Sequence, residues 1–193
     1  MSTPETYASL RTGGTPNSLL VDAVGLLGQG RSGLALDVGA GPLNDTRFML
    51  RAGLRVHAID RDPRTIAIAG ELDDLGLSVT RADIRDVPIA AGAYALVVAI
   101  HVLPFLPRED VAPVVSALID GVASGGIFCA TFLGPDDAWA DSRPRMTFTG
   151  RAKVTAMLAG LDPIELSERR YDGRNASGEP KRWHVVRCIC RKA

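Results

Sequence analysis

Short apolar runs alternate along the chain with segments in which apolar residues recur at helical spacing. The apolar runs predict strands at residues 34–38, 55–59, 78–82, 94–100, 127–133, 164–170 and 183–191. The helical spacing predicts helices at residues 17–27, 43–53, 63–75, 108–123 and 150–160. Asp62 and Thr149 stand immediately before two of these helices as candidate N-caps. Strands that alternate with helices in this way are typical of an α/β domain built on a mostly parallel sheet.

The last two predicted strands are joined differently from the others. Only 12 residues separate them, and these contain Gly173, Asn175, Ser177, Gly178 and Pro180. Such a segment is too turn-like for a crossover helix, so the two strands should pair as an antiparallel hairpin. We therefore expect one doubly wound α/β domain over residues 1–193, with a mostly parallel seven-stranded sheet and a C-terminal antiparallel hairpin. Within it, residues 34–193 form the α/β core and residues 1–30 a helical lid segment.

Composition places the chain among ordinary globular proteins, with 46% hydrophobic and 23% charged residues. No run approaches the roughly 20 apolar residues of a membrane helix, and the first residues lack the apolar core of a signal peptide. We therefore expect a cytoplasmic protein with no membrane contact. The three cysteines, Cys129, Cys188 and Cys190, fit neither a disulfide framework nor a zinc site, so we expect buried thiols and no metal.

The net charge is zero, but it is unevenly distributed. Residues 1–168 carry 14 basic and 20 acidic side chains, whereas residues 169–193 carry eight basic and two acidic ones. A basic segment can bind nucleic acid or an anionic substrate. Here the basic residues are spread through the predicted hairpin instead of forming a run. This spacing favours a solvated sheet edge, and it makes nucleic acid the less favoured partner.

A glycine turn, with the sequence LDVGAGPLN at residues 36–44, follows the first predicted strand. An acidic residue, Asp60, ends the second strand, where a carboxylate can accept hydrogen bonds from ribose hydroxyls. Both NAD and S-adenosylmethionine would use these features. The dinucleotide pattern G-x-G-x-x-G, however, has Asn44 in place of its third glycine, and Pro42 removes a backbone N–H that a pyrophosphate would need.

Carboxylates at the ends of three predicted strands favour the second cofactor. Asp37, Asp60 and Asp83 all lie where parallel strands would bring their carboxyl ends together. Their negative charge disfavours a pyrophosphate and suits the sulfonium and ammonium groups of S-adenosylmethionine. The two glycines of the turn then let the backbone approach the cofactor closely.

Several segments together carry a family resemblance: LDVGAG (36–41), HAID (57–60), ADIRDVPI (82–89), YALVVAIHVLPFL (94–106) and ASGGIF (123–128). With them, residues 17–193 resemble the class I S-adenosylmethionine-dependent methyltransferases, whose Rossmann-like fold also ends in an antiparallel hairpin. The resemblance is greatest to compact tellurite-resistance-like members, through the segments TPNS at residues 15–18 and VLPFL at residues 102–106. Leu43 departs from the family pattern, which often has a small residue there.

The resemblance implies a set of cofactor-binding residues. The glycine turn would face the methionine part of the cofactor, Asp60 the ribose, and Asp83 with its neighbour the adenine. The full set implied is Asp37, Gly39, Ala40, Gly41, Asp60, Arg61, Asp83, Ile84 and Ile100. After methyl transfer the product S-adenosylhomocysteine would occupy the same residues.

Methyl transfer from a sulfonium is an in-line displacement, to which an enzyme contributes chiefly positioning and desolvation. A general base is needed only where the acceptor must lose a proton, and His101, just after the fourth strand, is the candidate. Phe105 and the loop residues Arg143 and Arg145 are candidates for binding the acceptor. His184, next to Trp183 in the predicted hairpin, is expected to form a cross-strand packing pair. The absence of a predicted second domain favours a small-molecule acceptor.

Three other functions stay open at this point. A non-catalytic protein that binds S-adenosylmethionine would show the same motifs, because methyl transfer can proceed without a catalytic side chain. An NAD-dependent oxidoreductase would need the glycine turn to hold a pyrophosphate despite Pro42. A nucleic-acid methyltransferase would use the basic residues of the hairpin and would bind in a strongly salt-dependent way.

Overall fold

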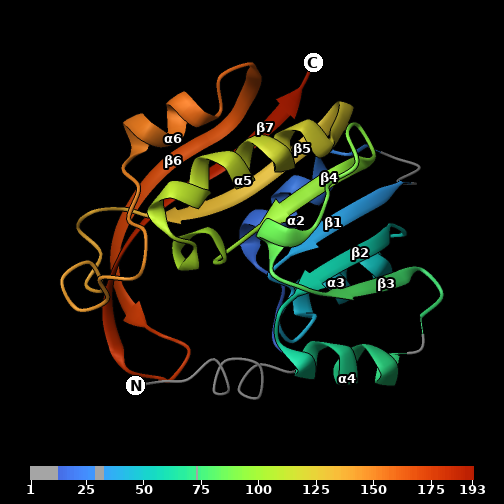
Figure 1. The fold of residues 1–193 in the computed structure, drawn as a ribbon, viewed down its shortest axis with the longest axis horizontal. Coiled ribbons are helices and arrows are strands. Elements are labelled where there is room, and N and C mark those ends of the chain that lie inside the picture. Colours follow the sequence, from blue (N-terminus) through green and yellow to red (C-terminus); the bar gives the residue numbers. More distant parts are fainter. Residues whose placement is uncertain (1–12, 29–32, 73) are drawn as a thin grey trace.

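A seven-stranded sheet with the strand order β3-β2-β1-β4-β5-β7-β6 forms the centre of the molecule (Figure 1). The computed structural model describes residues 13–28, 33–72 and 74–193. Its strands are β1 (Leu34–Val38), β2 (Arg55–Asp60), β3 (Leu77–Arg81), β4 (Tyr94–Ala99), β5 (Val122–Leu133), β6 (Leu161–Arg174) and β7 (Pro180–Lys192). Its helices are α2 (Ser18–Gly25), α3 (Asn44–Arg51), α4 (Pro63–Leu72), α5 (Arg108–Gly121) and α6 (Arg151–Met157), with short 3₁₀ helices η1 (Ile84–Asp86) and η2 (Leu103–Phe105).

Strands β1 to β5 run parallel to their neighbours, whereas β7 pairs antiparallel with both β5 and β6. The predicted seven-stranded, mostly parallel sheet with a C-terminal antiparallel hairpin is therefore confirmed. The chain crosses from β3 back to β4 on the other side of β1, so the strand order reverses between β1 and β4. Ligands of doubly wound sheets bind at such a reversal, outside the carboxyl ends of the strands.

Apolar side chains cover both faces of the sheet. On one face, α5 and α6 pack through residues such as Val115 and Val154. On the other, α2 and α3 pack through residues such as Leu20 and Met49. Cys188 and Cys190 lie in the α5 side of this core and Cys129 in the α2 side, so the prediction of buried thiols is confirmed.

The N-terminal helix forms where the pattern predicts it. Asn17 caps α2 by accepting a hydrogen bond from the backbone N–H of Leu19 at 3.0 Å, and Leu19, Leu20, Ala23 and Val24 are buried. Of the expected lid segment at residues 1–30, residues 1–12 and 29–30 lie outside the described part of the chain. No helix among the described residues has the length and apolarity that crossing a membrane requires.

The hairpin is longer than predicted and projects from the rest of the sheet (Figure 1). Strands β6 and β7 pair up to Arg174 and Pro180, so only residues 175–179 connect them. Asn175 closes this connection, because its Oδ1 accepts hydrogen bonds from the backbone N–H groups of Ser177 and Glu179. The far part of β6, from Arg169 onward, is largely exposed on both faces, so it lacks the period-two alternation by which a strand is recognised.

One predicted helix start is wrong. Thr149 does not cap α6, because Gly150 is the N-cap and the helix begins at Arg151. The backbone N–H of Thr149 instead donates to the carbonyl of Leu133 at the end of β5. This bond returns the long loop at residues 134–148 to the sheet before the helix starts.

Candidate cofactor and acceptor site

The glycine turn after β1 is tied to the end of β2. The backbone N–H groups of Gly39 and Ala40 both donate to the carbonyl of Ile59, at 2.8 and 3.2 Å. Gly39 has a φ of 72°, and a Cβ atom there would lie 2.7 Å from the side chain of Val102. Only glycine fits this position, and the turn therefore lies directly against the segment that follows β4.

Asp60 is held by two backbone groups. Its Oδ2 accepts the N–H of Gly41 at 2.7 Å, and its Oδ1 accepts the N–H of Asp62 at 2.8 Å. An ionised carboxylate offers about four acceptor positions, so each oxygen keeps one for a ligand hydroxyl. The carboxylate is therefore fixed between the glycine turn and the start of α4, where it could bind the hydroxyls of a ribose.

Asp37 is the most deeply buried acid of the candidate set, with 3% of its surface exposed. It accepts a hydrogen bond from the hydroxyl of Thr46 on α3. Burial, together with the nearby charges of Asp45 and Asp60, raises the pKa of Asp37 from 3.8 to about 7. Burial also raises the pKa of Asp45, which accepts the backbone N–H of Asn17. A bound cation would relieve this concentration of buried acid, so the donor set fits a sulfonium and ammonium ligand.

The third strand-end acid has a structural partner. Asp83 caps η1 by accepting the backbone N–H of Arg85, and it also accepts the Nε and a terminal nitrogen of the same arginine. The guanidinium of Arg85 lowers the pKa of Asp83. Ile84 beside it is buried and Arg61 is exposed. Asp83 and Ile84 therefore stand at the carboxyl end of β3 as the resemblance implies, with the carboxylate already paired.

Leu43, which departs from the family pattern, has a left-handed backbone with a φ of 60°. Its N–H donates to the carbonyl of Ala40, its carbonyl accepts the N–H of Arg47, and its side chain is fully buried. It packs with Ala40 and Ala58 beneath the partly buried apolar residues of α4. Leucine rarely adopts this conformation. The burial of its side chain holds the strained residue in place at the N-terminus of α3.

His101 begins the acceptor side of the site. It too has a left-handed φ, of 56°, and its backbone N–H donates to Thr131 Oγ1 at 2.8 Å. With Phe105 it lines a cavity of about 180 Å³ beyond the carboxyl ends of β4 and β5. Because Val102 touches Gly39, this cavity adjoins the glycine turn. Ile100, which ends β4 beside His101, is 9% exposed.

Most of the cavity wall comes from residues that were not singled out in the sequence. Trp139, Tyr171 and Trp183 line it together with His101, Phe105 and Arg174. The ring centroids of Trp183 lie 5.7 Å from Trp139 and 6.4 Å from Tyr171. The two tryptophans are the only ones in the chain. Their rarity was the one feature of the sequence that could have drawn attention to them. The hairpin register that brings them together could not be read from the pattern.

The two loop arginines are placed differently. The guanidinium of Arg143 lies over the ring of Trp139, 4.2 Å from its centroid, next to the cavity. Arg145 is exposed and is not part of the lining. Arg143 therefore remains a candidate for the acceptor end, whereas Arg145 lacks a position from which it could line the cavity.

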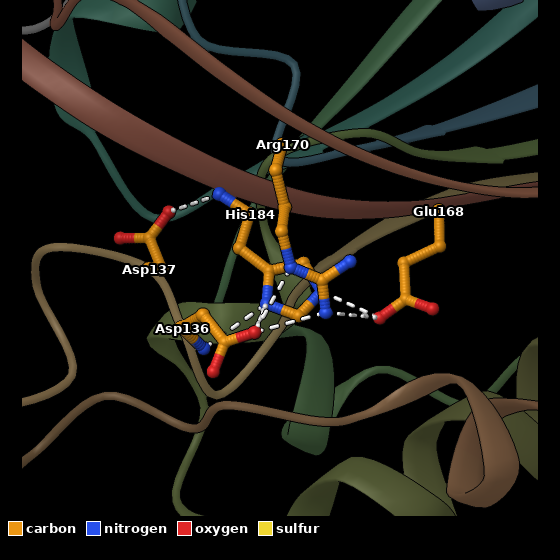
Figure 2. A network of polar contacts seen from close by, with 5 residues as sticks. All are labelled: Asp136, Asp137, Glu168, Arg170 and His184. Carbon is orange, nitrogen blue, oxygen red and sulfur yellow. Dashed lines mark hydrogen bonds and ion pairs between the residues drawn. The ribbon is translucent and has the colours of Figure 1, made fainter.

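A polar network around the buried residues Asp137 and His184 joins the loop at residues 134–148 to the hairpin. Figure 2 shows Asp136, Asp137, Glu168, Arg170 and His184 gathered there. His184 Nδ1 accepts the backbone N–H of Asp136 at 3.0 Å, which leaves Nε2 to donate to Glu168 at 2.6 Å. His184 therefore has its partners across the hairpin on β6, where it lies opposite Arg170 and bonds to Glu168, and this cross-strand contact is polar.

The comparison with family models gives residues 35–126 as a match to a methyltransferase domain. The matched range holds the glycine turn, Asp60, Asp83 and His101. Residues 35–126, a little less than half of the chain, therefore match a methyltransferase domain, and the fold is that of the class I S-adenosylmethionine-dependent methyltransferases. The cofactor of this family is S-adenosylmethionine.

Solved methyltransferases share the fold at low sequence identity. TehB from Haemophilus influenzae superposes with a TM-score of 0.76 and 18% identity, over 92% of this chain and 62% of TehB. NodS, an N-methyltransferase from Bradyrhizobium japonicum solved with S-adenosylhomocysteine, superposes with a TM-score of 0.69 and 19% identity, over 97% of this chain and 98% of NodS. A third structure is the 1,6-didemethyltoxoflavin-N1-methyltransferase of Burkholderia thailandensis, with bound 1,6-didemethyltoxoflavin and S-adenosylhomocysteine. It superposes with a TM-score of 0.67 and 18% identity, over 91% of this chain and 79% of that enzyme.

These identities establish the fold alone, and this methyltransferase chain spans less than two thirds of TehB. The TehB likeness agrees with the resemblance to the compact tellurite-resistance-like subgroup. A search of the curated proteins found no match.

Proposed function

We propose that this methyltransferase transfers a methyl group from S-adenosylmethionine to a small-molecule acceptor by in-line displacement. One observation carries the proposal: Gly39 of the glycine turn lies against Val102, which directly follows the cavity-lining residue His101 in the chain. A cofactor on the turn and a small acceptor in the cavity would therefore meet at the carboxyl ends of β1 and β4. A cavity of about 180 Å³ suits a small molecule better than a nucleotide strand or a protein segment.

The cofactor residues have separate roles in this proposal. Asp60 binds the ribose hydroxyls, and the turn at Gly39, Ala40 and Gly41 packs against the methionine part. Asp37 supplies negative charge beneath that turn. At the other end, Ile84 and Ile100 provide apolar walls, with Asp83 and Arg61 beside the adenine. The contacts that support these roles are the backbone bonds that fix Asp60 and the turn.

The acceptor side contributes position and a proton acceptor. When bound, the cofactor supplies a methyl group on a sulfonium, which an acceptor lone pair attacks in line while the carbon–sulfur electron pair stays on sulfur. The aromatic cavity excludes water and holds the acceptor against the turn. His101 takes the proton from an acceptor that must lose one. Phe105 and Arg143 contact the acceptor from the remaining sides.

The basic hairpin does not favour a nucleic-acid substrate. Most of its cations have partners within the chain: Arg170 pairs with Asp136, Lys181 with Asp137, and Arg187 with Glu165. Arg174, Arg191 and Lys192 donate to backbone carbonyls. Nucleic-acid binding needs several cations that neutralise phosphates together and so release the counterions of the nucleic acid, whereas three of the hairpin cations are already paired with acids of the chain.

A ligand-induced thermal shift tests the cofactor half of the proposal. S-adenosylhomocysteine at about 100 times its Kd should stabilise the wild type by about 2.7 kcal/mol, or about 5–10 °C in Tm. Asp60→Ala should lose most of that shift, whereas Glu71→Ala, an exposed acid on α4, should keep it. A shift with NAD and none with S-adenosylhomocysteine would contradict the proposal. Binding without turnover across an acceptor screen would favour a non-catalytic binding protein.

A further inference from the structure

The cavity beside His101 is walled mainly by rings. His101, Phe105, Trp139, Tyr171 and Trp183 supply five of its lining side chains, and Arg174 is its charged one. Tyr171 and Trp183 lie nearly parallel, with 17° between their planes, while His101 and Trp139 are tilted against Trp183 by 52° and 57°. The rings therefore form a continuous surface around Trp183, on which a flat ligand can make stacked and edge contacts.

From this surface we propose that the cavity binds a planar aromatic acceptor that carries an anionic group. The inference rests on the proposed methyltransferase function and names the acceptor class of that same site. A volume of about 180 Å³ is close to the roughly 150 Å³ of an engineered apolar cavity in another protein that binds benzene. One substituted ring, or two small fused rings, would fill it.

Aromatic walls also attract cations, so the sign of the ligand charge needs an independent argument. Here the ring faces already hold a cation: the ammonium of Lys181 lies 3.3 Å from the centroid of Trp183 and 3.9 Å from that of Trp139. Arg143 lies over Trp139 as well, and Arg174 lines the cavity itself. Among the described residues, none that lines the cavity is a carboxylate. A second cation would therefore be repelled, whereas an anionic group is attracted.

The acid nearest to these rings is already paired. Both oxygens of Asp137 lie 2.8 Å from Lys181 Nζ, and Oδ2 also accepts the backbone N–H of His184 at 3.1 Å. Asp137 therefore balances the charge of Lys181, whereas the lining itself contains the guanidinium of Arg174. The same contacts, with that of Asp136 to His184, fix the loop of Trp139 to the strand of Trp183 (Figure 2). A wall fixed in this way loses little entropy when a ligand binds.

Intrinsic fluorescence can report on this wall alone, because Trp139 and Trp183 are the only tryptophans in the chain. We would titrate the full chain, with and without S-adenosylhomocysteine, with three probes of similar size. Benzoate is aromatic and anionic, cyclohexanecarboxylate is anionic but not aromatic, and phenyltrimethylammonium is aromatic and cationic. Benzoate should bind about three to ten times more tightly than cyclohexanecarboxylate, and at least about ten times more tightly than phenyltrimethylammonium.

Variants separate the two parts of the inference. Trp183→Leu should remove the preference for benzoate over cyclohexanecarboxylate. Trp139→Phe, a milder change, should reduce tryptophan emission but keep the preference for benzoate. Arg174→Gln should weaken both anions equally, whereas Arg169→Gln, an exposed position outside the lining, should change neither. An unchanged thermal shift with S-adenosylhomocysteine shows that each variant is folded.

Two results would overturn the inference while leaving the methyltransferase function intact. Equal binding of benzoate and cyclohexanecarboxylate to the wild type would remove the aromatic class, and tighter binding of phenyltrimethylammonium would reverse the charge. A lack of any S-adenosylhomocysteine shift, with benzoate still bound selectively, would instead count against the proposed function and not against the cavity.

Discussion

Asp137 and Lys181 form an ion pair from which solvent is excluded on both sides. The side chains are 0% and 2% exposed, and the closest nitrogen–oxygen distance is 2.8 Å. The pair connects the loop after β5 to the start of β7, and Lys181 stands between the rings of Trp139 and Trp183. A buried pair of this kind is costly to desolvate. Its position suggests that it serves to hold the two tryptophans in one arrangement.

Removal of the carboxylate alone should destabilise the protein strongly. Asp137→Ala leaves the ammonium of Lys181 buried without its partner, which costs about 3–5 kcal/mol in unfolding free energy. The double variant Asp137→Leu with Lys181→Met should recover most of that loss, because an apolar pair of similar volume carries no desolvation cost. Urea denaturation of Asp137→Leu, Lys181→Met and the double variant measures the coupling. Additive effects would show that the pair does not act as a unit.

Asp37 makes stability depend on pH in a definite direction. Its folded pKa of about 7 lies above the ordinary 3.8, so between these values the folded state holds a proton that the unfolded state has lost. The unfolding free energy should therefore fall as pH rises from about 4 to 7, by up to about 4 kcal/mol. Below that range both states are protonated, and above it the full cost of the buried charge is present.

Asp37→Asn should remove this slope and be more stable than the wild type above pH 7 in the absence of cofactor. Asp22→Asn, an exposed acid on α2, controls for the change in charge. Thr46→Val should move the slope to higher pH, since it deletes the hydroxyl that favours the ionised form. Chemical denaturation at a series of pH values gives each profile. A wild-type stability that rises across the same range would contradict the burial of an acid at this position.

The strained backbone at Leu43 predicts an unusual order of variant stabilities. Leu43→Ala loses a buried side chain and keeps the left-handed φ, at a cost of about 2–5 kcal/mol. Leu43→Gly loses the same side chain but relieves strain of about 1–2 kcal/mol. The glycine variant should therefore be no less stable than the alanine variant. At Ala117, exposed on α5, Ala117→Gly should instead cost about 1 kcal/mol. Thermal unfolding of the three variants decides this.

The sheet and the cofactor side of the site were predictable because their signals are local. Buried parallel strands read as apolar runs, as β4 does. Their order in the family places Asp37, Asp60 and Asp83 at one edge, and the structure has them there. The left-handed Leu43 could not be foreseen, since nothing in its neighbours distinguishes a strained leucine from an ordinary first residue of a helix.

The acceptor cavity was not predictable, because it depends on register. Trp139, Tyr171 and Trp183 come from a loop and two strands, and only the pairing of Tyr171 with Trp183 brings them onto one face. A shift of the hairpin by one residue would turn that ring to the other side. The exposed far part of β6 has no alternation from which the register could be predicted, and the connection to β7 is set by Asn175.

His101 offers the most direct test of proton transfer, because its backbone and its side chain can be changed separately. Asparagine tolerates a left-handed φ, so His101→Asn should keep the fold and the S-adenosylhomocysteine shift while it removes the imidazole. With an acceptor that must lose a proton, kcat of the wild type should fall at low pH as the imidazole becomes protonated.

His101→Asn should lose that pH dependence and about 10²–10⁴ in rate at neutral pH. Thr131→Val keeps the imidazole but deletes the hydroxyl that accepts the His101 N–H. It should lower the rate less and leave the shape of the pH profile unchanged, as expected for a positioning residue. If His101→Asn matches the wild type in both rate and profile, then His101 is a wall of the acceptor cavity, and catalysis there rests on position and desolvation alone.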